Sequence, residues 1–159
     1  MNRALVLLLL IFALALPALS QDSAYVPARD YDPHRDPARD LQAAIAEAHH
    51  SDRNILLDVG GHWCKWCHYM DKFFDDHADL RELREKNFVV VYVNYGDDNK
   101  NDKFLAQFPK IAGCPHLFVL NADGKLVHSQ DTSELEDGKS SYVPEKFRVF
   151  LTHYGPGKN

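Results

Sequence analysis

Two cysteines three residues apart, Cys64 and Cys67, have the type and spacing that point most directly to chemistry. They follow an apolar run over residues 54–59 and stand where a helix is predicted to begin. Unpaired backbone N–H groups and the macrodipole stabilise a thiolate at a helix N-terminus. This predicts a redox-active dithiol. In it Cys64, exposed at the helix start, is the attacking thiolate, and Cys67 is the thiol that closes the disulfide.

Two other kinds of site use a similar pair of cysteines. A zinc site would need histidine ligands besides the three cysteines of the chain, with His68 among the nearest. The string Cys64-x-x-Cys67-His68 is also the attachment signature of a c-type haem. A haem site would leave the preceding strand and the dipeptide Cys114-Pro115 unexplained. Both alternatives stay open, and we favour redox chemistry without a cofactor or metal.

Asp58 is an acidic residue inside the apolar run, between Leu57 and Val59. A run of this composition is typical of a strand covered on both faces, so we expect Asp58 to be buried. Burial raises the pKa of a carboxyl group, which suits it to proton transfer near neutral pH. We therefore predict that Asp58 is a general acid/base for Cys67.

Four residues are candidates for contact with a substrate. Trp63 and Trp66 could form an aromatic rim that docks peptides, or pack against the domain itself. A cis bond between Cys114 and Pro115 would offer main-chain groups to an extended substrate peptide. Cys114 itself is either a small buried hydrophobic residue or a third thiol within reach of the pair, and we predict that it stays free when Cys64 and Cys67 are oxidised.

The ends of the chain and its charge restrict where it works and what it binds. Residues 1–20 combine Arg3, an apolar stretch and small residues before Gln21, which predicts a cleaved export signal; an uncleaved membrane anchor is the alternative. The 159 residues carry a formal net charge of −5 without a basic stripe, which argues against nucleic acid as a partner. Three cysteines are too few for a disulfide scaffold in an exported domain of this size.

Between the two ends, the pattern predicts a flexible arm over residues 21–35, one domain over residues 36–154 and a short tail over residues 155–159. Within the domain, we expect helices over 37–50, 64–77, 102–108 and from 144, a short helical turn near 80–88, strands over 54–59, 88–95, 117–120 and 125–128, and an acidic loop over 130–141. Parallel strands followed by an antiparallel hairpin predict an α/β fold, in which helices flank a mixed four-stranded sheet.

This arrangement, with Trp63-Cys64-x-x-Cys67 and a later Cys114-Pro115, resembles the thioredoxin superfamily over residues 37–154. Asp58 stands where thioredoxins keep a buried carboxylate, and Pro115 where they keep a cis-proline that faces the dithiol. The chain is similar to exported bacterial thioredoxin-like proteins and to the periplasmic C-terminal domain of thiol:disulfide interchange reductases. It departs from the usual pattern in having cysteine before that proline, and no lysine near Asp58 on the second strand.

The resemblance implies a periplasmic, monomeric thiol:disulfide oxidoreductase that acts on cysteine-containing exported proteins and exchanges electrons with a membrane-bound or soluble thiol partner. By analogy with the interchange reductases, a reductase or an isomerase is expected rather than a strong oxidase. The non-enzymatic alternative is a redox-inert binding or chaperone module that uses the aromatic rim.

Overall fold

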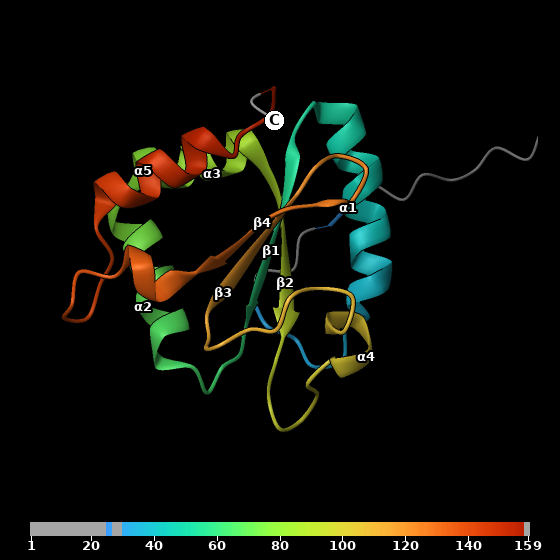
Figure 1. The fold of residues 1–159 in the computed structure, drawn as a ribbon, viewed down its shortest axis with the longest axis horizontal. Helices are drawn as coiled ribbons and strands as arrows, with labels where there is room; N and C mark the ends of the chain where they lie inside the picture. The colour runs from blue at the N-terminus through green and yellow to red at the C-terminus, as the bar shows by residue number, and fades with distance from the viewer. Residues whose placement is uncertain (1–24, 27–29, 158–159) are drawn as a thin grey trace, which may run out of the picture.

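The computed structural model describes residues 25–26 and 30–157 (Figure 1). The predicted export signal lies outside these residues. The described elements are α1 (Pro37–Ser51), β1 (Asn54–Gly60), α2 (Lys65–Asp76), α3 (Ala78–Asn87), β2 (Phe88–Asn94), α4 (Asp102–Leu105), β3 (His116–Leu120), β4 (Leu126–Asp131), a 3-10 helix (Thr132–Leu135) and α5 (Pro144–His153).

The four strands form one sheet in the order β2-β1-β3-β4. β1 pairs in parallel with β2 and antiparallel with β3, and β4 pairs antiparallel with β3. Figure 1 shows α1 and α4 on one face of the sheet and α2, α3 and α5 on the other. The predicted α/β fold with a mixed four-stranded sheet is confirmed.

Alternation along β1 decides which face of the sheet each side chain reaches. Leu57 and Val59 pack in the core beneath α1, whereas Leu56 packs with the core residues of α2 and α5. Asp58 shares the face of Leu56, and its register partner on β2 is Tyr92. The strand therefore directs the carboxyl group of Asp58 toward the layer that contains the two cysteines.

The fold differs from the prediction in the extent of several elements. The short helical turn is the ten-residue helix α3, whose Leu80 is fully buried. α4 ends at Leu105, well before Pro109. β4 runs to Asp131 and continues directly into the 3-10 helix, so the acidic loop is shorter than expected. These boundaries depend on packing against neighbouring elements, which weak periodicity does not encode.

In the segment before α1, for which the sequence predicts a flexible arm, several described residues contact the domain. Tyr31 is only 3% exposed. The side-chain amide of Asn99 donates a hydrogen bond of 2.9 Å to the carbonyl of Pro33. The hydroxyl group of Tyr25 donates to the carbonyl of Val90 on β2. An aromatic side chain with a polar end finds both an apolar environment and a hydrogen-bond partner inside the domain, which anchors this segment.

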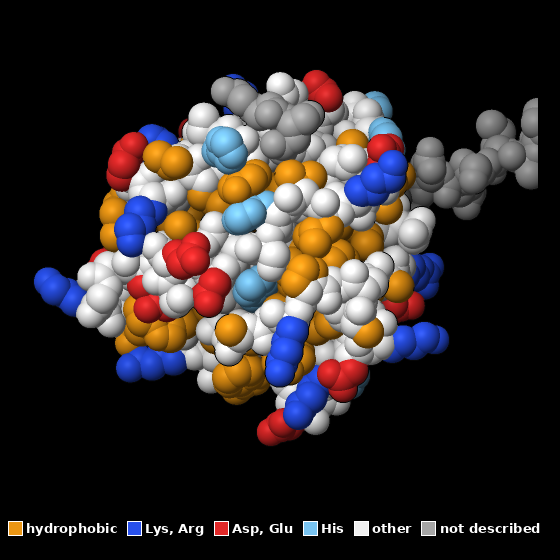
Figure 2. All heavy atoms as spheres, viewed as in Figure 1, with side chains coloured by type: hydrophobic (Ala, Val, Ile, Leu, Met, Phe, Trp, Pro, Cys, Tyr) orange, Lys and Arg blue, Asp and Glu red, His pale blue; other side chains and the backbone are white. Residues whose placement is uncertain are grey.

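On the face in Figure 2, Lys and Arg side chains are interspersed with Asp and Glu side chains. Within the described residues, no helix has both the length and the apolar composition that crossing a membrane requires.

Candidate functional site

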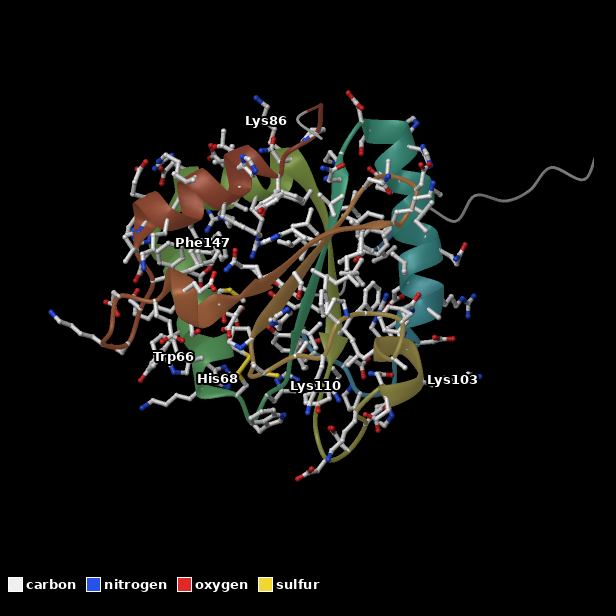
Figure 3. The ribbon with its side chains drawn as sticks, in the orientation of Figure 1. Trp66, His68, Lys86, Lys103, Lys110 and Phe147 are labelled. Carbon is white, nitrogen blue, oxygen red and sulfur yellow. A yellow bond between two sulfur atoms is a disulfide. The ribbon has the colours of Figure 1, made fainter. Side chains whose placement is uncertain are left out.

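The two cysteines predicted to form a redox pair are joined in a disulfide at the start of α2, with their Cα atoms 5.3 Å apart. Cys64 is the N-cap residue of α2, and its sulfur accepts a hydrogen bond of 3.1 Å from the backbone N–H of Cys67. Figure 3 shows the sulfur atoms beside the first turn of this helix, which carries Trp66 and His68. The helix N-terminus thus donates to the sulfur of Cys64, as the sequence predicted.

Cys64 is not exposed in this disulfide state, contrary to our expectation. Its exposed fraction is 2%, and Cys67 is fully buried. Both cysteines form one core cluster with Tyr31, against which Trp66 and Tyr92 pack. Cys64 is covered because its sulfur is turned into the helix start and the segment before α1 brings an aromatic ring to the same cluster.

Asp58 is buried, as predicted, with 2% of its surface exposed. Burial raises the pKa of its carboxyl group from 3.8 to about 7, because a charged group in an apolar interior is poorly solvated. A hydrogen bond from Tyr31 and the positive charge of Arg84 oppose this rise, while the negative charge of Asp71 adds to it. A carboxyl group with such a pKa can accept or release a proton near neutral pH.

Tyr31 is a residue of the site that sequence reasoning missed. Its hydroxyl group donates a hydrogen bond of 2.8 Å to Oδ1 of Asp58. Its ring meets that of Tyr92 edge to face, with centroids 5.2 Å apart. Burial and the neighbouring negative charge of Asp58 raise the pKa of Tyr31 well above 10, so the phenol keeps its proton and acts as a donor. The one signal in the sequence was an aromatic residue isolated in a polar segment.

The peptide bond between Cys114 and Pro115 is cis, as predicted. The buried hydroxyl group of Thr132, at the start of the 3-10 helix, donates a hydrogen bond of 2.5 Å to the carbonyl of Pro115. Thr132 was not predicted from the sequence, because it reaches the proline only through the turn after β4. This hydrogen bond holds the main chain of Pro115 in place.

Cys114 is a free, half-buried thiol, as predicted, and packs against the cluster that contains the disulfide. Burial raises the pKa of this thiol to about 11, and the negative charge of Asp58 acts in the same direction. Because a thiol is nucleophilic as the thiolate, Cys114 is poorly reactive at neutral pH.

The two tryptophans of the predicted rim lie in different environments. Trp63 is 63% exposed, and its indole N–H donates a hydrogen bond of 2.8 Å to the carbonyl of Tyr95. It borders a surface hollow together with Gly96 and Lys100. Trp66 instead packs edge to face against Tyr69 and Tyr142. Trp63 is therefore the tryptophan that presents an aromatic surface to the outside.

Metal ions need sets of ligand side chains that lie close together. Among residues 25–26 and 30–157, no three side chains of His, Cys, Asp and Glu converge as a metal site would require. Nε2 of His68 lies 2.7 Å from the carbonyl oxygen of His62, so this ring is engaged locally.

The sequence is similar to that of known proteins. A profile of the thioredoxin-like family matches residues 36–122. The chain is 28% identical over 88 residues to the thiol:disulfide interchange protein DsbD of Vibrio cholerae. The aligned residues cover 55% of this chain and 14% of that protein. It is 36% identical over 102 residues to the thiol:disulfide interchange protein DsbE of Pseudomonas aeruginosa. Here the aligned residues cover 63% of this chain and 49% of that protein.

The fold is also similar to that of solved structures. A crystal structure described as a disulphide isomerase from Xylella fastidiosa superposes with a TM-score of 0.65 at 25% identity, over 77% of this chain and 93% of that one. The chain spans less than half the length of the two curated relatives.

Proposed function

Because the chain belongs to the thioredoxin-like family, we propose that it is a thiol:disulfide oxidoreductase that exchanges disulfides with cysteine-containing exported proteins. The observation that carries this proposal is the Cys64–Cys67 disulfide at the N-terminus of α2, on the side of the sheet where Asp58 is buried. We assign Cys64 as the nucleophile, Cys67 as the resolving thiol and Asp58, which is hydrogen-bonded to Tyr31 of the cysteine cluster, as the proton acceptor.

In the reductase direction, the thiolate of Cys64 attacks one sulfur of a substrate disulfide and displaces the other as a thiolate. Cys67 then gives its proton to Asp58, and its thiolate attacks the sulfur of Cys64. The Cys64–Cys67 disulfide forms, and the second substrate sulfur leaves as a thiolate that takes up a proton from water. The substrate gains the two electrons that the cysteine pair loses.

The similar proteins support a role as a reductase or an isomerase rather than as a strong oxidase. The two curated relatives are named thiol:disulfide interchange proteins, and the similar solved structure is described as a disulphide isomerase. Repeated reduction requires a membrane-bound or soluble thiol partner that returns the pair to the dithiol. The exposed Trp63 and the main chain at Pro115 are the groups we assign to docking of substrate peptides.

We also propose that the protein is exported to the periplasm and works there as a monomer. Residues 1–20 have the composition of an export signal, and a disulfide pair at the site suits an oxidising compartment. Periplasmic fractionation followed by N-terminal sequencing tests this part, and a mature chain beginning at Gln21 is the expected result.

Reduction of insulin by dithiothreitol, followed as turbidity, tests the activity. We expect the wild-type protein and Cys114→Val to accelerate it, and Cys64→Ser to be inactive. Cys67→Ala should form a lasting mixed disulfide with the substrate, visible as a mass increase. If wild type and Cys64→Ser were equally inactive and both suppressed aggregation of an unfolded protein, the chain would be a binding or chaperone module instead.

A further inference from the structure

Building on the proposed function, we propose that Tyr31 is a positioning residue of the active site: its hydroxyl group holds Asp58 in place as the carboxylate that receives the proton of Cys67. Tyr31 lies outside the helices and strands of the domain, before α1, and no sequence pattern links it to the two cysteines.

The first argument is the convergence of three groups at Gly60. A Cβ atom placed on Gly60 would lie 2.5 Å from the sulfur of Cys67 and 2.9 Å from the hydroxyl oxygen of Tyr31. The same hydroxyl group donates to Oδ1 of Asp58 at 2.8 Å. The phenol hydroxyl therefore borders the same glycine as the sulfur of Cys67 while it donates to the carboxyl group, and glycine leaves the space for both.

The second argument is the direction of the electrostatic effect. A donor at hydrogen-bond distance favours the charged form of a carboxyl group, and the hydrogen bond from Tyr31 opposes the effect of burial on the pKa of Asp58. Because the phenol of Tyr31 keeps its proton at neutral pH, it remains able to donate to the charged carboxylate of Asp58. Without this hydroxyl group Asp58 would stay protonated up to a higher pH. While it is protonated, it cannot accept a proton from Cys67.

Besides Tyr31, two charged groups shift the pKa of Asp58: Asp71 of α2 raises it and Arg84 of α3 lowers it. The other neighbours of Asp58 come from several elements and are affected by its charge: Tyr92 of β2, Cys114 before β3, and Tyr142 before α5. Among these neighbours, Tyr31 is the one whose side chain donates a hydrogen bond to the carboxyl group.

The test uses Tyr31→Phe, which keeps the ring and removes the hydroxyl group, with Tyr92→Phe as the matched control. Tyr92 contacts the ring of Tyr31 but does not donate to Asp58. Both variants are made in a Cys114→Val background, so that only two thiols react. The reduced protein is mixed with an aromatic disulfide, 5,5′-dithiobis(2-nitrobenzoate), which releases one coloured thiolate when Cys64 attacks and a second when Cys67 resolves the mixed disulfide.

We expect Tyr31→Phe to leave the first release unchanged and to slow the second about tenfold at pH 6.5. The midpoint of the pH profile of the second step should move up by about one unit, as expected for losing a hydrogen bond to a charged group. Tyr92→Phe should keep the wild-type profile. The proposal is overturned if the two variants have the same profile, or if Tyr31→Phe slows both steps equally at every pH, which would indicate a purely structural role.

A second measurement depends neither on folding of Tyr31→Phe nor on enzymatic turnover. In oxidised wild-type protein labelled with ¹³C at Cζ of tyrosine, one resonance should shift as Asp58 titrates near pH 7, and this titration should be absent in Asp58→Asn. If no tyrosine resonance follows Asp58, Tyr31 is not coupled to it and the proposal fails. If the resonance follows Asp58 but wild type cannot reduce insulin, the proposed function fails while the coupling of Tyr31 to Asp58 stands.

Discussion

Gly60, the last residue of β1, lies directly against the sulfur of Cys67. A Cβ atom on this glycine would approach that sulfur to 2.5 Å and the ring of Tyr31 to 2.9 Å. Real Cβ atoms do not approach other atoms so closely, so any side chain here must displace the disulfide or the tyrosine. The strand thus ends in glycine where the backbone passes close beneath the resolving cysteine.

Gly60→Ala is expected to destabilise the oxidised protein by about 1–3 kcal/mol, the usual cost of overpacking a buried site. Chemical unfolding measures this difference. Gly113→Ala is the control, because a Cβ atom on Gly113 would meet no atom within 4 Å. Equal stability of the two variants would show that the site tolerates a methyl group at Gly60.

Asp58→Asn is expected to change how stability depends on pH. The carboxyl group keeps its proton to about pH 7 in the folded chain, whereas an aspartate in an unfolded chain loses it near pH 4. The folded state therefore binds more protons between these values, and wild-type stability falls as pH rises, by about 1.4 kcal/mol per pH unit. That stability is fully present below pH 4 and is lost by about pH 7.

Denaturant unfolding of the oxidised proteins at pH 4, 6 and 8 tests this expectation. Asp58→Asn should lack this decline and become the more stable protein at pH 8. Asp97→Asn, which changes a fully exposed acid, should follow wild type. Parallel stability curves for wild type and Asp58→Asn would contradict a raised pKa for Asp58.

Cys114 is expected to react slowly with alkylating agents in the oxidised protein. Burial holds the pKa of its thiol at about 11, so only a small fraction is thiolate at pH 8. The rate of iodoacetamide labelling, measured by mass spectrometry, should rise about tenfold per pH unit up to about pH 10. Cys114→Val should show no labelling, and a rate that levels off near pH 8 would mean that the thiol is not desolvated.

The purified, reduced protein is expected to contain no stoichiometric zinc and no covalent haem. His68, the histidine in the haem-type string, is engaged by the carbonyl of His62, and its two partner cysteines are placed for disulfide exchange. Elemental analysis checks for zinc. A Soret band that survives acid-acetone extraction would establish the haem alternative, and one tightly bound zinc ion per chain would establish the metal site.

The parts of the site that the sequence predicts lie on regular elements or within a few residues of each other. An apolar run with one acid predicted the buried strand and the burial of Asp58, because a strand covered on both faces leaves no exposed side. Two cysteines three residues apart at a strand-to-helix junction predicted the disulfide at the N-terminus of α2. The order of helices and strands was enough for the mixed sheet, because connection rules permit few arrangements.

Contacts between distant and irregular segments came only from tertiary packing. Tyr31 reaches Asp58 across 27 positions from a segment without periodicity, and Thr132 reaches Pro115 across 17. The burial of Cys64 depends on the same packing, because its neighbours in the cluster include Tyr31. Periodicity records which side of its own helix or strand a residue occupies, but not which distant side chain will lie against that side. The local sequence is therefore enough to predict the chemistry of the cysteine pair, whereas the residues that control its proton transfer come together only in the folded protein.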